Sequence, residues 1–120
     1  MWREAFALVE AGVCDARTID TVVKNSFGRR LSVLGPMENA DLVGLELIRD
    51  VHRILFPHLC QNQSPSALLE RLLGKGETGV GTGKGLFEWS EDSIEEVRSK
   101  LANHLIASAE TATHPGETNE

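Results

Sequence analysis

Apolar residues recur at intervals of three and four along most of this chain, and this spacing constrains its fold more than any other feature. The clearest case lies within residues 45–59, where an apolar stripe faces a charged one (Leu47, Ile48, Val51, Ile54 and Leu55 against Glu46, Arg49, Asp50 and Arg53). Such intervals place side chains on one face of an α-helix. A half-buried strand would show alternation instead. The pattern therefore predicts helices.

Glycine and proline divide this pattern into separate helices. We expect helices within residues 2–12, 15–28, 36–44, 45–59 and 65–74, and a last one that begins with a capping box of Ser93 and Glu96. The short piece "GLFEW" is the one strand-like run, and a strand needs partners. The sequence predicts an all-α fold, a compact bundle of about five or six helices in residues 1–107, without a Rossmann domain. Residues 108–120 are small, polar and acidic, which predicts a flexible tail.

Charge and composition exclude several classes of protein. Hydrophobic residues make up 41% of the 120 residues and charged residues 25%, as in soluble globular domains. No apolar run reaches the ~20 residues of a membrane span, and the first residues do not resemble a signal peptide. Cys14 and Cys60 lie far apart, which disfavours disulfide or zinc frameworks and predicts a cytoplasmic location.

The net charge of −6 is confined to one end of the chain. Residues 1–85 hold ten acidic and ten basic side chains, whereas residues 86–120 hold eight acids against Arg98 and Lys100. No basic stripe follows any helix, so we expect no nucleic-acid partner.

The stretch "GETGVGTGKGLFEW", residues 76–89, invites comparison with nucleotide-binding loops. A Walker A loop needs a glycine where Thr78 stands and a hydroxyl where Gly85 stands. The G-x-G-x-x-G pattern fails as well, because Lys84 or Leu86 occupies the last position. The stretch therefore predicts a tight surface turn and no cofactor site.

Other polar groups give weak signals. His52 and His58 are six residues apart, which does not place two metal ligands on one helical face. Arg29 and Arg30 could bind a phosphate or carboxylate, or could simply complement the dipole of the preceding helix. We expect no catalytic residue, no metal site and no cofactor-binding residue within this chain.

Three pieces in order resemble the C-terminal domain of the L-3-hydroxyacyl-CoA dehydrogenase family, which includes 3-hydroxybutyryl-CoA dehydrogenases. They are "REAFALVEAGVCDARTIDTVVKNSFGRR", "GPMENADLVGLELI" and "GVGTGKGLFEW", and the resemblance spans about Trp2 to Trp89. The matches are Arg3-Glu4-Ala5, Ile19-Asp20, Gly28-Arg29, Gly35-Pro36, Asp41-x-x-Gly44-Leu45 and Gly79 through Thr82-Gly83-Lys84-Gly85. Gly81, Leu86 and Phe87 depart from the family's lysine, phenylalanine and tyrosine.

The resemblance implies a helical module that forms the dimer interface and one wall of the acyl-CoA cleft. The family's NAD-binding domain and its catalytic His-Glu pair lie on a preceding domain. NAD is therefore implied for the complete enzyme, and the chain alone is expected to be inactive and to bind acyl-CoA only with that domain. The residues expected in the substrate cleft or interface are Phe27, Gly28, Arg29, Arg30, Leu34, Gly35 and Pro36.

Several readings of function remain open at this point. The expected one is part of an NAD-dependent 3-hydroxyacyl-CoA dehydrogenase of fatty-acid or hydroxybutyrate metabolism. The alternatives are a free-standing acyl-CoA-binding module, a structural dimerisation module, and a domain of a related hydroxy-acid or polyol dehydrogenase. A homodimer is expected because more apolar residues are present than a small core needs beside its helical stripes (Trp2, Phe6, Val33, Leu34, Met37 and Leu86).

Overall fold

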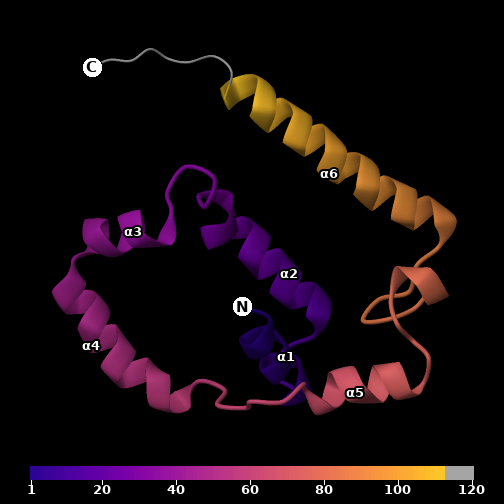
Figure 1. Cartoon of the computed structure of the whole chain (residues 1–120), viewed down its shortest axis with the longest axis horizontal. Coiled ribbons are helices and arrows are strands. Elements are labelled where there is room, and N and C mark those ends of the chain that lie inside the picture. Colours follow the sequence, from indigo (N-terminus) through magenta and orange to yellow (C-terminus); the bar gives the residue numbers. More distant parts are fainter. Residues whose placement is uncertain (113–120) are drawn as a thin grey trace. The chain divides into compact units, whose positions relative to one another are not determined.

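The computed structural model describes residues 1–112, which form six α-helices and three short 3-10 turns (Figure 1). The α-helices are α1 (Trp2–Glu10), α2 (Ala16–Asn25), α3 (Pro36–Val43), α4 (Leu45–Leu55), α5 (Ala67–Gly74) and α6 (Glu91–Ala112). The 3-10 turns are η1 (Phe27–Arg29), η2 (Phe56–His58) and η3 (Val80–Thr82). The described residues contain no strand, only two isolated β-bridges near Lys84. The all-α prediction is confirmed.

Several helix boundaries follow signals that the sequence carries. The Asp15 carboxylate accepts a hydrogen bond of 2.8 Å from the Thr18 N–H at the start of α2. Hydrogen bonding from Thr18 holds the pKa of the Asp15 carboxyl below its ordinary value. Gly12 follows α1 with a φ of 75°, a conformation that favours glycine. At α3, Pro36 occupies the first turn, where its missing N–H costs nothing.

The start of α6 corrects one prediction. The backbone N–H of Ser90 donates to Ser93 Oγ at 2.8 Å, and the backbone N–H of Ser93 donates to Ser90 Oγ at 3.0 Å. The capping pair is therefore Ser90 and Ser93, and the box of Ser93 and Glu96 was placed one turn too late. Glu96 instead approaches Lys100, one turn further along α6, at 3.4 Å. The helix continues to Ala112, and the remaining residues of the predicted tail, 113–120, lie outside the described residues.

The described chain divides into two units, residues 1–71 and the residues from Leu72 onward. In the first unit, α1 contacts α2, and α3 contacts α4. In the second unit, the end of α5 leads through the glycine-rich residues 76–89 into α6 (Figure 1).

Residues 60–66, which we call the crossing segment, tie the first unit together. Both oxygens of the Glu4 carboxylate accept from the Cys60 backbone N–H, at 3.1 and 2.9 Å. The Ser66 hydroxyl donates to Glu10 Oε2 at 2.9 Å. The two carboxylates lie near opposite ends of α1, so the segment is held along the length of that helix.

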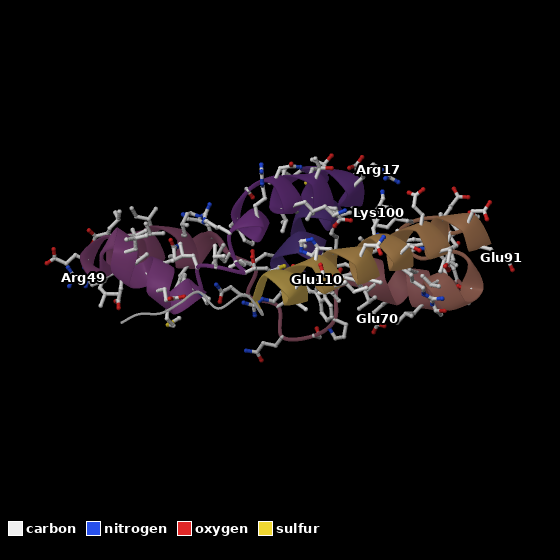
Figure 2. The ribbon with its side chains drawn as sticks, turned by 90° about the horizontal axis from the view of Figure 1, so that it is seen from above. Arg17, Arg49, Glu70, Glu91, Lys100 and Glu110 are labelled. Atoms are coloured by element: carbon white, nitrogen blue, oxygen red, sulfur yellow. The ribbon has the colours of Figure 1, made fainter. Side chains whose placement is uncertain are left out.

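Neither unit closes a core of its own. No side chain among residues 1–110 is buried, although many apolar ones are half-buried. On α4 the apolar stripe predicted from the sequence is largely open, with Ile54 67% and Leu47 53% exposed. Figure 2 shows side chains standing outward from the helices, as with Arg49 on α4. Apolar helix faces left open in this way are the surfaces that proteins cover with another part or another copy.

Candidate functional site

Six of the seven residues expected in the cleft or interface lie in the connection between α2 and α3, and the seventh, Pro36, begins α3. Phe27–Arg29 form η1, and the Arg30 carbonyl accepts from the backbone N–H groups of Val33 and Leu34, at 3.0 and 2.8 Å. The Gly35 N–H donates to Glu38 Oε1 at 2.8 Å where α3 begins. The structure therefore brings these residues together as one folded turn.

Gly28 fixes this turn against the end of α2. A Cβ at this position would lie 2.5 Å from the backbone oxygen of Val23 and 3.3 Å from the Val23 carbonyl carbon. Real side chains do not approach a backbone oxygen so closely, and Gly28 is therefore required for η1 to meet α2.

Unpaired cations surround the turn. Residues 21–34 contain Lys24, Arg29 and Arg30 but no acidic residue. Within the described residues, none of these three side chains has an ion-pair partner. A guanidinium pair of this kind can bind a carboxylate or a phosphate, and equally an acidic segment of a protein.

Two grooves in the first unit were not expected from the sequence. The first, about 450 Å³, runs along α4 beside His52 and Phe56, whose rings stack with centroids 4.3 Å apart. The second, about 310 Å³, lies between α1 and the crossing segment, where the Arg3 guanidinium donates to the Asn62 carbonyl at 3.4 Å. Its wall is both apolar and polar (Trp2, Arg3, Phe6, Ala7, Glu10, Cys60, Asn62, Gln63, Ser64, Ser66 and Leu69). The seven expected residues line neither of these grooves.

The glycine turn, residues 76–89, is organised around one hydroxyl. Thr82 Oγ1 accepts from the Thr78 backbone N–H at 3.0 Å and lies 3.2 and 3.0 Å from the carbonyl oxygens of Gly79 and Lys84. The Lys84 ammonium lies 3.6 Å from a Glu77 carboxylate oxygen. The side chains of Thr82, Lys84 and Glu77 thus make their contacts within the turn itself.

The same turn cannot serve as a phosphate cradle in this conformation. A dinucleotide loop offers free backbone N–H groups to the phosphates. Here five of those groups donate internally: Gly79 to Lys84 O, Thr82 to Gly79 O, Gly83 to Val80 O, Gly85 to Phe87 O and Trp89 to Gly83 O, at 2.8–3.1 Å. Gly83 also has a φ of 77°, and a Cβ on Gly85 would lie 2.8 Å from Gly79 Cα. The residues of this turn do not fit NAD.

The described residues hold neither a metal-binding cluster nor a membrane-spanning helix. No three His, Cys, Asp or Glu side chains among residues 1–112 lie close enough together to hold a metal ion. No helix in that range is long and apolar enough to cross a membrane.

The described residues thus form a helical domain with open helix faces, an arginine-bearing turn and an internally hydrogen-bonded glycine turn. Comparison with known families identifies the family of this domain. Residues 1–89 match the family model described as "3-hydroxyacyl-CoA dehydrogenase, C-terminal domain". The chain therefore belongs to this family, and the predicted resemblance is confirmed.

Similar proteins include two curated dehydrogenases. The chain is 29% identical over 105 residues to the 5-formyl-3-hydroxy-2-methylpyridine 4-carboxylate 5-dehydrogenase of Mesorhizobium japonicum, covering 88% of this chain and 34% of that protein. It is 39% identical over 46 residues to the L-carnitine dehydrogenase/betainyl-CoA thioesterase of Rhizobium meliloti, covering 38% of this chain and 9% of that protein.

A solved structure agrees with the sequence comparison. The crystal structure of a 5-formyl-3-hydroxy-2-methylpyridine 4-carboxylic acid 5-dehydrogenase, described as an NAD⁺-dependent dismutase, superposes with a TM-score of 0.88 at 26% identity. The match covers 96% of this chain and 37% of that one. The chain thus spans about a third of the length of this dehydrogenase.

Proposed function

We propose that this chain is the substrate-cleft and dimerisation domain of an NAD-dependent dehydrogenase, and that NAD binding and hydride transfer belong to another domain. The observation that carries the proposal is the superposition over 96% of this chain on 37% of a dehydrogenase described as NAD⁺-dependent. The internal hydrogen bonding of the glycine turn supports it, because five backbone N–H groups of this turn donate to carbonyl groups of the turn itself.

The substrate is a hydroxy compound that carries an anionic group. The family name favours a 3-hydroxyacyl-CoA and a role in fatty-acid or hydroxybutyrate metabolism. The relative from Mesorhizobium instead favours a small ring carboxylate, since its substrate name contains a 4-carboxylate. In both cases the connection from Phe27 to Pro36 meets either the cleft or a second copy of the chain. Two unpaired half-buried thiols, Cys14 and Cys60, support a cytoplasmic location.

An assay of the 120-residue chain tests whether NAD binding and hydride transfer belong to another domain. We expect no NAD binding by calorimetry and no NADH formation from 3-hydroxybutyryl-CoA or from a pyridine 4-carboxylate substrate. Addition of the NAD-binding part of the Mesorhizobium relative should restore turnover with one of the two. Turnover by the chain alone would overturn the proposal. Tight binding of acetoacetyl-CoA by the chain alone would favour a free-standing acyl-CoA-binding module.

Dimerisation is the second half of the proposal. Trp2, Val33 and Met37 are 82%, 81% and 76% exposed, which is unusual for large apolar side chains in water. A two-fold contact would cover them with a copy of the same surface. Sedimentation equilibrium should show a dimer, and Leu34→Glu should dissociate it with helicity retained. A monomer that persists at high micromolar concentration would refute this part.

A further inference from the structure

We propose that the end of α2 and the turn that follows it, residues 21–34, bind Ser90 and the first two turns of α6, residues 90–97, of a second copy of this chain. The inference rests on the proposed dimer and specifies which two surfaces form it. Both segments lie within the described residues. The first carries basic side chains and no acidic ones, and the second carries acidic side chains and no basic ones.

The first surface is cationic and partly apolar. Residues 21–34 carry Lys24, Arg29 and Arg30 without a single acid, and these side chains have no ion-pair partner within residues 1–112. The same residues include the apolar Val22 and Leu31, which are 57% and 44% exposed. Gly28, seated on the Val23 carbonyl, holds the backbone of η1 against the end of α2.

The second surface is the complement of the first. Residues 90–97 carry Glu91, Asp92, Glu95 and Glu96 without a single base, beside the apolar Ile94 and Val97. Only Glu96 has an ion-pair partner within the described residues, Lys100 at 3.4 Å. Glu91 stands out at the beginning of α6 and Lys100 further along it (Figure 2). The apolar stripe of α6 continues beyond this segment, since Leu101 and Leu105 are both 57% exposed.

Symmetry favours a second copy as the occupant. In a two-fold dimer the turn of each copy receives the helix of the other, so the complementary pair is formed twice and the assembly closes. Together, the two contacts must bury the roughly 800 Å² per partner that a stable interface buries. Opposite charges at the rim add orientation and speed of association, and the apolar side chains between them add affinity.

Charge reversal tests the pairing by sedimentation equilibrium of the full chain. Arg29→Glu/Arg30→Glu should weaken the dimer about 100-fold, and so should Glu91→Lys/Glu95→Lys. The matched control is Arg49→Glu/Arg53→Glu on α4, which makes the same change in net charge and should leave the dissociation constant within about threefold. A chain that carries all four reversals in the two segments should regain the dimer, since each new glutamate then meets a new lysine.

Crosslinking identifies which copy provides the helix. Equal amounts of ¹⁴N and ¹⁵N chains are mixed and treated with a carbodiimide, which joins Lys24 to an acid of residues 91–96. Mixed-isotope peptide pairs are expected. Pairs of one isotope only would overturn the inference, because α6 would then cover the turn of its own chain. A wild-type monomer would refute the dimer itself, whereas a dimer that survives the reversal at Arg29 and Arg30 would refute only this pairing.

Discussion

The crossing segment and the glycine turn are both connections between helices, yet they are held in opposite ways. In the glycine turn the hydrogen bonds join residues no more than six positions apart, such as Trp89 with Gly83. In the crossing segment, Glu4 and Cys60 are 56 positions apart, as are Glu10 and Ser66. A local turn depends on the conformations its own residues can adopt, whereas a long-range contact depends on whether another element is already in place.

The largest effect should come from Gly85→Ala, which attacks the glycine turn directly. Its Cβ would lie 2.8 Å from Gly79 Cα, so the backbone must move, at a cost of roughly 3 kcal/mol. Amide hydrogen exchange at Gly79 and Trp89 should accelerate strongly. The control is Gly81→Ala, whose Cβ has nothing within 4 Å and whose φ is not positive. Equal protection in the two variants would show that the close approach does not matter.

Thr82→Val should have the next largest effect. It keeps the shape but removes the hydroxyl that accepts from Thr78 and bonds two carbonyl groups, a loss of about 1–3 kcal/mol. The Thr78 amide should lose protection while the Cys60 amide keeps it. Thr78→Val provides the control, because the Thr78 hydroxyl makes one bond of 3.4 Å only. If both variants behave alike, Thr82 is not the centre of the turn.

Glu4→Gln tests the crossing segment and should cost about 1 kcal/mol. The amide can still accept from the Cys60 N–H, but the carboxylate charge that strengthens this bond is lost. Exchange of the Cys60 amide should accelerate and that of the glycine turn should not. Glu10→Gln should do less, since the Glu10 carboxylate is exposed to water. Accelerated exchange in residues 76–89 would contradict the separation of the two regions.

The smallest effect concerns Asp15, a local contact in the first unit. Hydrogen bonding from Thr18 lowers the pKa of Asp15 in the folded chain, so its contribution is present above the unfolded pKa of roughly 4 and is lost as the pH falls through the folded value. An NMR titration of the Thr18 amide should give a midpoint below 3.8. A midpoint at or above 3.8 would show that the Asp15 carboxylate does not cap α2.

Helix boundaries that depend on nearby residues were predictable from the sequence. Gly12, Asp15 and Pro36 act through their own backbone conformation or through a neighbour three residues away, so a short window contains all that is needed. The start of α6 was misplaced because Ser90 and Ser93 can each cap a helix, and only the backbone direction decides which one does.

Long-range features could not be predicted from one sequence. Glu4 and Glu10 on α1 look like ordinary solvated carboxylates, and nothing nearby indicates that Cys60 and Ser66 will reach them. The groove beside the crossing segment depends on those contacts and was missed for the same reason. The seven residues expected in the cleft or interface come from a family resemblance, which supplies their order but not the cationic surface around them.

The separation of 56 residues between Glu4 and Cys60 also sets an order of events during synthesis. The glycine turn can form within microseconds once its few residues are available. At 5–20 residues per second, about 3–11 s pass between the emergence of α1 from the ribosome and that of Cys60. Throughout that interval the Glu4 carboxylate is without the Cys60 N–H that later donates to it, so the crossing segment joins α1 only after the helices between them have been made.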